Sequence, residues 1–281
     1  MREIHTDKIR DAVRQLYLDM LCTIGDDITL ALRSGLEQEE SPIGCMLLRQ
    51  LLENNEIARN ERVGICQDTG MAILFVELGQ EIHLTGGSFE DAVNQGVREA
   101  YEEGYFRKSV VDDPLFDRIN TKDNTPAVIH LRLLPGDKIC ITAMAKGFGS
   151  ENMSAMRMLV PADGEEGVLK TILDTVRQAG PNPCPPIIVG VGIGGTMEVA
   201  AQLAKYATAR PIGDRHADPR YADLEQKALS AINALGIGPG GLGGRVTALD
   251  VHIESCPTHI AGLPVAVNIC CHASRHGKCE I

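Results

Sequence analysis

Two apolar runs of strand length constrain the fold of this chain more than any other feature. Residues 71–78, MAILFVEL, and residues 187–195, IIVGVGIGG, are apolar almost throughout. A run of this kind, bounded by turn residues, is typical of a strand buried in the interior of a sheet. The chain is therefore expected to build its core on buried strands.

Helical signals surround these strands. Apolar residues at helical spacing predict two helices within residues 4–33. Ser41 followed by Pro42 predicts the start of another helix, and Ser88 predicts a further one. Residues 126–147 are expected to form a hairpin around a Pro-Gly-Asp turn. Strands and helices do not alternate regularly, so we expect a mixed α/β (α+β) fold, with helices on mixed or antiparallel sheets, and not a doubly wound Rossmann fold.

No linker, repeat or low-complexity tract divides the 281 residues. We therefore expect one domain over residues 1–281, with a helical N-terminal part at 1–60 and an α/β part at 61–281 that carries the site. The length is sufficient for a substantial buried core.

Charge and composition exclude several classes of function. The formal net charge of −11 argues against duplex nucleic acid or an anionic membrane as the main partner, because both need a cationic face. We see no stretch of about 18 apolar residues, and the charged N-terminus lacks the apolar core of a signal peptide. A cytoplasmic protein is therefore expected. Its nine cysteines are then not expected to form a framework of disulfide bonds, because the cytoplasm keeps thiols reduced.

The first candidate for chemistry is CQDTG at residues 66–70, directly before an apolar run. An Asp-Thr-Gly sequence before a strand is most often a simple turn. A nearby carboxylate such as that of Asp68 does not by itself activate the thiol of Cys66, because a negative charge disfavours the thiolate. A bound metal would instead hold the thiol as thiolate.

The second candidate is Cys184, which three prolines bracket. The prolines keep its backbone out of a regular helix or ladder, although a buried cysteine in an irregular loop would look the same. A formal G-x-G-x-x-G pattern follows at Gly190, Gly192 and Gly195, with Asp214 about 20 residues further. This pattern leaves a nicotinamide-dependent oxidoreductase as an alternative. Its context is poor, because two glycines lie inside the strand and no βαβ unit is evident.

The third candidate is the C-terminal segment, where eight Cys or His residues fall between His252 and Cys279. A zinc-stabilised binding module is the alternative here, although the paired C-x₂-C knuckles of such sites are absent. Cys271 lies at a predicted strand end near Arg275.

The fourth candidate is AKGFGSEN at residues 145–152, together with Arg107. The AKGFGSEN segment could equally be a Gly-rich exit from a strand, and Arg107 could equally be a solvated charge at a helix end. Their lysine, glycines and guanidinium would nevertheless suit a carboxylate ligand. Three cysteine-bearing motifs far apart in sequence could supply the three thiolates that hold three irons of a cubane cluster and leave the fourth iron open.

In combination these motifs make the chain resemble the α subunit of the iron–sulfur hydro-lyases, the class I fumarate hydratase and L-tartrate dehydratase family. The resemblance runs from about residue 40 to the end, through CQDTG, FRKS, AKGFGSEN, CPP, VGIGGT, GGLGG and SCPTH. It implies a [4Fe–4S] cluster held by Cys66, Cys184 and Cys271. Cys271 is preferred to Cys270 because the family's ligand lies four residues before an arginine, here Arg275.

The same resemblance implies a reaction and its residues. It implies reversible hydration of fumarate to (S)-malate, with the open iron as Lewis acid, and an oxygen-sensitive enzyme of the tricarboxylic acid cycle. Asp68 and His259 are the implied catalytic residues. The implied substrate contacts are Gln67, Asp68, Arg107, the backbone of Gly147 and Gly149, and His259.

The segment around Lys146 indicates the branch of the family. Lys146 and its neighbours are similar to the fumarase branch, whereas tartrate dehydratases tend to carry a Gly-Gly-Gly-Cys type segment, so L-tartrate is the alternative substrate.

The chain also departs from the family pattern in two ways. Phe148 stands where several members have glycine, which affects the expected pocket shape. The chain also ends ten residues after Cys271, before the domain that carries further catalytic residues in single-chain members. A separate β subunit is therefore expected, in a heterotetramer, with no role assigned to Cys256, Cys270 or Cys279.

Overall fold

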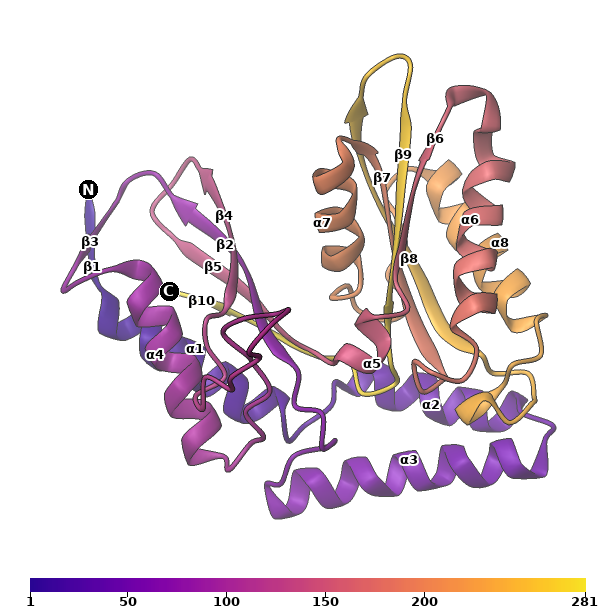
Figure 1. The fold of residues 1–281 in the computed structure, drawn as a ribbon, viewed down its shortest axis with the longest axis horizontal. Helices are drawn as coiled ribbons and strands as arrows, with labels where there is room; N and C mark the ends of the chain where they lie inside the picture. Colours follow the sequence, from indigo (N-terminus) through magenta and orange to yellow (C-terminus); the bar gives the residue numbers. More distant parts are fainter. The chain divides into compact units, whose positions relative to one another are not determined.

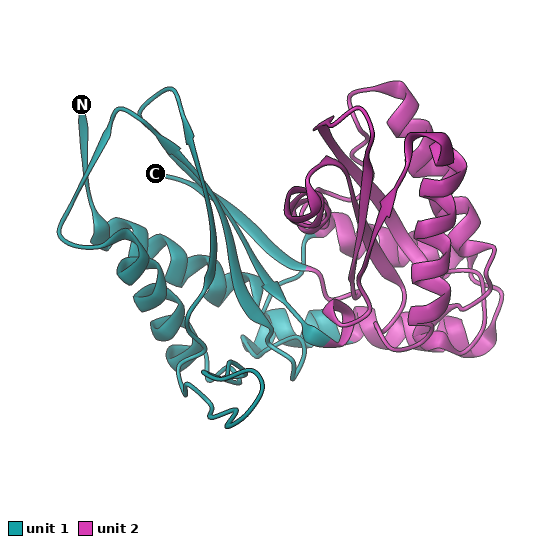
Figure 2. Ribbon diagram, turned by 45° about the horizontal axis from the view of Figure 1, so that its top comes forward, with its two compact units in different colours: residues 1–25, 54–148, 275–281 teal, residues 26–53, 149–274 magenta.

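The computed structural model describes all residues from 1 to 281, and the chain forms two compact units (Figure 2). Each unit is built from separate segments of the chain. Unit 1 comprises Met1–Gly25, Asn54–Phe148 and Arg275–Ile281, and unit 2 comprises Asp26–Glu53 and Gly149–Ser274. That residues 1–281 act as one domain stays a prediction. Helices and mixed sheets occur in both units, which confirms the mixed α/β class.

Unit 1 contains a four-stranded sheet, a two-stranded sheet and two helices (Figure 1). Its elements are β1 (Arg2–His5), α1 (Thr6–Met20), β2 (Met71–Gly79), β3 (Ile82–Thr85), α4 (Phe89–Glu103), β4 (Val128–Leu134), β5 (Ile139–Lys146) and β10 (Arg275–Glu280). Helices α1 and α4 share one hydrophobic core with β2 and β5. This core includes the fully buried rings of Tyr17 and Tyr101.

The prediction of a hairpin over residues 126–147 is wrong. The strand order is β10-β5-β2-β4, so β2 lies between β4 and β5. β2 pairs parallel with β4 and antiparallel with β5. The reason is burial, because β2 is apolar along most of its length and a central position gives it a paired strand on each edge, while one of its faces packs in the core with α1 and α4.

Unit 2 has a four-stranded sheet with helices on both faces (Figure 1). Its elements are α2 (Asp26–Gln38), β6 (Ala155–Leu159), η1 (Pro161–Asp163), α6 (Gly164–Ala179), β7 (Ile187–Gly195), α7 (Met197–Ala207), α8 (Pro219–Asn233), η2 (Pro239–Gly241), β8 (Ala248–Thr258) and β9 (Leu263–Cys270). Helices α6 and α8 pack on one face in a single apolar core, and α7 covers the other. The chain passes from one unit to the other after Gly25, within α3 (Pro42–Glu61), within α5 (Phe148–Glu151) and after Ser274.

The strand order of unit 2 is β6-β9-β7-β8. β7 pairs parallel with β8, which returns after α7 and α8, and antiparallel with β9. The expectation that no strand returns to complete a βαβ unit is therefore wrong. Two of the four glycines of β7 serve helix packing, because a Cβ at Gly190 would lie 2.1 Å from the carbonyl oxygen of Ala204 and one at Gly192 would lie 2.0 Å from that of Ala200. Glycine here allows α7 to approach the strand backbone closely.

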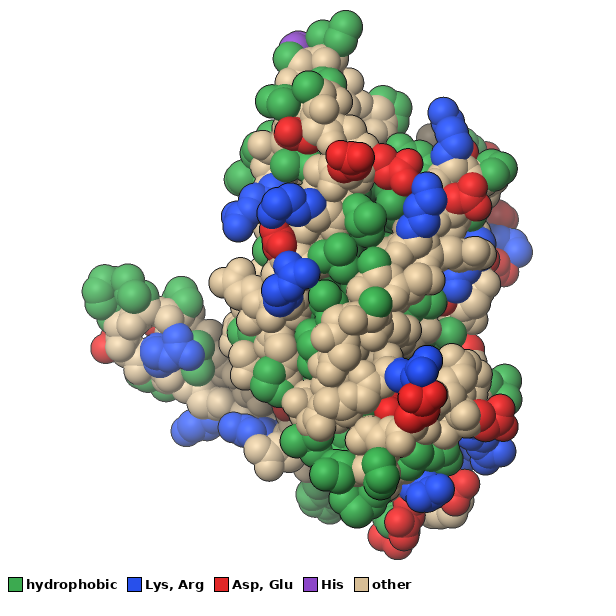
Figure 3. Space-filling model, turned by 90° about the vertical axis from the view of Figure 1, so that its right-hand side faces the viewer, with side chains coloured by type: hydrophobic (Ala, Val, Ile, Leu, Met, Phe, Trp, Pro, Cys, Tyr) green, Lys and Arg blue, Asp and Glu red, His purple; other side chains and the backbone are tan.

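The predicted helix starts at residues 42 and 88 are confirmed. The Ser41 hydroxyl accepts a hydrogen bond from the Gly44 N–H (3.2 Å), and α3 begins at Pro42. Ser88 is the N-cap of α4, and its side chain accepts from the Asp91 N–H. No helix combines the length and the apolar character that crossing a membrane requires. On the face of the molecule in Figure 3, acidic and basic side chains are interspersed.

Candidate functional site

The CQDTG segment forms an irregular turn that leads into β2 in unit 1. Gly70 has a positive φ of 74°, and a Cβ there would lie 2.8 Å from backbone atoms of Ala145 and Lys146. Only glycine fits this approach, because it combines a left-handed conformation with no side chain. The turn is thereby held directly against the backbone of β5.

Asp68 is fixed by three separate hydrogen bonds. Its Oδ1 accepts from the Gly70 N–H (3.0 Å), and its Oδ2 accepts from the Phe148 N–H (2.8 Å). Its carbonyl oxygen accepts from Nη1 of Arg275 (2.5 Å). The Asp68 carboxylate therefore has a defined orientation, and it lies against Gly147, where a Cβ would be 3.0 Å from Oδ2.

Residues on α4 and the loop after it anchor the same turn. The Tyr101 hydroxyl donates to the Thr69 carbonyl (2.7 Å), and Asn124 Nδ2 donates to the Gly70 carbonyl (3.1 Å). The Thr69 hydroxyl donates to the carbonyl of Arg107 (2.6 Å). Burial raises the pKa of Tyr101 well above its ordinary value, so its hydroxyl stays a donor.

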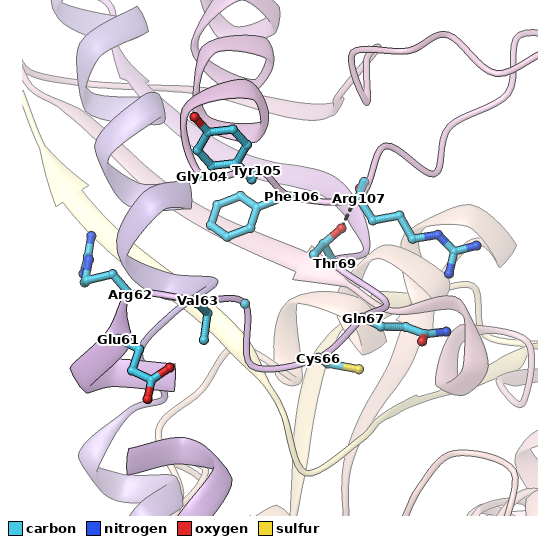
Figure 4. Close-up of a pocket in the computed structure, with 11 residues that line it drawn as sticks. Glu61, Arg62, Val63, Cys66, Gln67, Thr69, Gly104, Tyr105, Phe106 and Arg107 are labelled. Carbon is cyan, nitrogen blue, oxygen red and sulfur yellow. Dashed lines mark hydrogen bonds between the residues drawn. The ribbon is translucent and has the colours of Figure 1, made fainter. Parts of the chain in front are cut away.

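A pocket of about 740 Å³ opens beside this turn in unit 1, lined by Cys66, Gln67, Thr69 and Arg107 among others (Figure 4). The side chains of Cys66, Gln67 and Arg107 point toward the same side of the pocket, whereas Glu61 and Arg62 lie at its other side. The thiol of Cys66 is exposed. The pocket thus presents a thiol, an amide and a guanidinium together, which suits an anionic ligand.

Cys184 and Cys271 lie at the same end of the sheet in unit 2. Cys184 comes three residues before β7 begins, and Cys271 directly follows the last residue of β9. These strands are antiparallel, with Ile188 opposite Cys270, so the start of β7 and the end of β9 lie at the same end of the sheet. Cys184 has a positive φ of 54°, a conformation that is costly for a residue with a Cβ. Strain of this kind is often kept for a functional reason.

The loops around Cys184 are built from tight turns. The Cys184 N–H donates to the Pro181 carbonyl (3.1 Å), and the Gly240 N–H donates to the Pro185 carbonyl (2.8 Å). Gly149 is close to this loop, because a Cβ on it would lie 3.8 Å from the Asn182 carbonyl oxygen. The predicted residues Gly149, Cys184 and Cys271 therefore gather at one end of unit 2.

The structure does not bring His259 to that end. His259 lies in the turn between β8 and β9, and β8 runs parallel to β7. This turn is at the top of unit 2 in Figure 1, at the opposite end of the sheet from the start of β7. Residues 260–262 and the eight residues of β9 separate His259 from Cys271. β9 alone spans roughly 25 Å. His259 of one chain therefore cannot share a small site with Cys184 and Cys271 of the same chain.

The remaining cysteines have ordinary surroundings. No disulfide is present among the nine, and Cys22 and Cys270 are buried. Burial raises the pKa of the Cys256 and Cys279 thiols. Within neither unit do three Cys, His, Asp or Glu side chains converge as a preformed metal site.

Three contributors to the site were not found by sequence reasoning. Tyr101 belongs to an ordinary helical pattern, which does not indicate a contact with the CQDTG turn. Arg275 was used only to choose Cys271 as the ligand in preference to Cys270. Asn124, which has a positive φ of 62°, lies in a DNTP stretch whose turn composition could have marked it.

Comparisons with known proteins agree on one family. The family model described as "Fumarate hydratase (Fumerase)" matches residues 10–280. A protein named "Putative L(+)-tartrate dehydratase subunit alpha" from Methanocaldococcus jannaschii is 43% identical over 272 residues, covering 95% of each chain. The "L(+)-tartrate dehydratase subunit alpha" of Escherichia coli strain UTI89 is 33% identical over 279 residues, covering 98% of this chain and 91% of that one. This chain belongs to the fumarate hydratase (Fumerase) family, and it is a hydro-lyase enzyme.

Proposed function

We propose that the chain is the α subunit of a two-subunit iron–sulfur hydro-lyase that adds water to, or removes it from, a small dicarboxylate. The observation that carries this proposal is the fixed Asp68 carboxylate, held by the Phe148 and Gly70 N–H groups next to the pocket of Cys66 and Arg107. Related chains named as α subunits support a separate β subunit.

The chemistry of three cysteines supports the cluster that the family resemblance implies, because thiolates are the usual ligands of iron–sulfur clusters. Cys66 presents an exposed thiol at the pocket, and Cys184 and Cys271 gather at one sheet end in a strained, turn-rich setting. We assign these three thiolates as ligands of a [4Fe–4S] cluster. When bound, such a cluster supplies one iron with an open position, which acts as a Lewis acid toward a hydroxyl leaving group.

Residues of the protein would orient the substrate and transfer its protons. Arg107 and Gln67 point to one side of the pocket and orient a substrate carboxylate. Asp68 is positioned to hold or release the proton of the departing hydroxyl oxygen. The β subunit supplies the base that removes the proton from C3. The backbone of Gly147 and Gly149 allows substrate to approach closely.

We propose fumarate and (S)-malate as the substrate pair, from the similarity of the Lys146–Gly147 segment to the fumarase branch. L(+)-tartrate is the second candidate, and the names of the related α subunits favour it. A cytoplasmic location and a role in the tricarboxylic acid cycle stay proposals that depend on this choice.

His259 enters the proposed site only from a second copy of the chain. Within one chain it is at the far end of the sheet from Cys184 and Cys271. Two copies of the α subunit, as in the expected heterotetramer, would allow each to supply His259 to the other.

The test is an EPR spectrum of the anaerobically reconstituted, reduced complex of the chain with its β subunit. Spectra are recorded with no addition, with (S)-malate and with L(+)-tartrate. We expect a cluster signal that one of the two acids shifts, and we expect Cys66→Ser to lose that signal while Cys45→Ser retains it. No cluster under strict anaerobiosis, or the same signal after Cys66→Ser, would refute the proposal.

A further inference from the structure

Arg275 is a deeply buried cation that donates a hydrogen bond to the backbone of Asp68. Arg275 is 3% exposed. It is the first residue of β10 and pairs with Ala145 of β5. Burying a guanidinium is costly unless its donors are used, so a functional or structural reason is expected. Here Nη1 donates to the Asp68 carbonyl oxygen, and Nε has no hydrogen-bond partner.

The second arm of the guanidinium reaches the Asp68 carboxylate region. A Cβ placed on Gly147 would lie 3.3 Å from Arg275 Nη2 and 3.0 Å from Asp68 Oδ2. Both groups therefore lie against the same face of Gly147. Lysine could not reproduce this arrangement, because it offers a single ammonium where arginine offers two separated amino groups in one plane.

The Arg275 contact is one of the bonds that hold Asp68 in place. One carboxylate oxygen is bound by the Phe148 N–H and the other by the Gly70 N–H. Those bonds align the carboxylate only if the Asp68 backbone is held at the correct distance from β5. The hydrogen bond from Arg275 holds the Asp68 carbonyl, and strand pairing holds Arg275 to β5.

We propose that Arg275 is a positioning residue for Asp68, the group to which the proposed function assigns proton transfer. It clamps the Asp68 backbone and confines its carboxylate against Gly147, and it does not bind substrate itself. This inference rests on the proposed function for the role of Asp68. Misplacement of a catalytic group by about 1 Å can reduce a rate roughly a hundredfold.

The test is a double-mutant cycle with Asp68→Asn and Arg275→Lys in the anaerobic holoenzyme with its β subunit. We expect Arg275→Lys to lower kcat by roughly tenfold to a hundredfold with KM changed by less than about threefold. We expect the double variant to equal Asp68→Asn alone, because a residue that acts only through Asp68 has nothing further to lose. Additive losses, or a raised KM at unchanged kcat, would refute the proposal.

Arg210→Lys is the matched control. Arg210 is also buried, and its Nη1 donates to the Ile253 carbonyl (3.0 Å), but it belongs to unit 2 and has no contact with Asp68. We expect this variant to lower stability and leave kcat unchanged. Iron and sulfide content is measured for every variant, and a loss of cluster in Arg275→Lys would count against a positioning role.

A second readout does not depend on activity. Hydrogen exchange of the Gly70 and Phe148 amides reports whether the Asp68 carboxylate still occupies its place. We expect faster exchange at both amides in Arg275→Lys and Arg275→Gln, and unchanged exchange in Arg210→Lys. If the complex lacks hydro-lyase activity but these amides respond as expected, the proposed function fails while the structural clamp stands; unchanged exchange refutes the clamp itself.

Discussion

Gly192 in β7 has a packing role that its sequence pattern hides. The G-x-G-x-x-G match suggested a phosphate-binding turn, yet Gly190 and Gly192 lie within the strand and face the backbone of α7. A Cβ at Gly192 would lie 2.0 Å from the Ala200 carbonyl oxygen. This oxygen belongs to the backbone of α7, which cannot move aside as the end of a flexible side chain can. The pattern therefore reflects helix–strand contact, and the nicotinamide alternative loses its main support.

We predict that Gly192→Ala lowers the free energy of unfolding by roughly 1–3 kcal/mol, the usual cost of overpacking. Urea denaturation of the purified chain would measure this as a lower midpoint at unchanged slope. Gly262→Ala is the control, because its Cβ would meet no atom closer than 3.9 Å. Equal midpoints for the two variants would show that α7 does not need the close approach.

β8 shows how an edge strand can be protected by buried charge. The outward backbone groups of Ile253 bind side chains, since its N–H donates to Glu225 (2.8 Å) and its carbonyl accepts from Arg210 (3.0 Å). The Val251 N–H likewise donates to Asp250 (2.8 Å). These contacts occupy backbone groups of Val251 and Ile253 that would otherwise be open for pairing with another chain.

The buried carboxylate of Asp250 makes the stability of the folded protein depend on pH. Burial alone would raise the pKa of Asp250, but His252 and Arg215 outweigh it and lower the pKa from 3.8 to about 2. A lowered folded-state pKa stabilises the protein above pH 4, and this contribution is lost as the pH falls toward 2. It amounts to about 2 kcal/mol.

We therefore predict that Asp250→Asn destabilises the chain by about 2 kcal/mol at pH 7. The difference between the variant and the natural protein should shrink as the pH falls from 4 toward 2. Urea midpoints measured from pH 7 down to pH 3 would test both statements. A difference that stays constant with pH would mean that the charge of Asp250 contributes nothing to stability.

Assembly of the whole molecule is tested most sharply through His259. If His259 serves a site in a second copy, chains with His259→Ala and chains with Cys66→Ser should each be inactive alone. Co-expressed with the β subunit, they should recover activity in hybrid complexes, where one intact Cys66 site receives His259 from the other chain. Complementation that fails in isolated hybrid complexes would exclude a contribution from the second copy.

The sequence by itself determined the helix starts, the buried strands and the motifs that place the chain in its family. Caps such as Ser41 and Ser88 act within four residues of their own position, so local sequence is enough to specify them. The mixed α/β class followed from the same local signals.

Tertiary structure alone decided which strands are neighbours and which candidate residues meet. β2 separates β4 from β5, and β8 returns beside β7, because burial of apolar strands rewards contacts between distant segments. The same long-range pairing puts Cys184 and Cys271 at one sheet end and His259 at the other, and it brings Arg275 to Asp68 across 207 positions of sequence. No local pattern contains these distances, because they are set by the packing of whole elements.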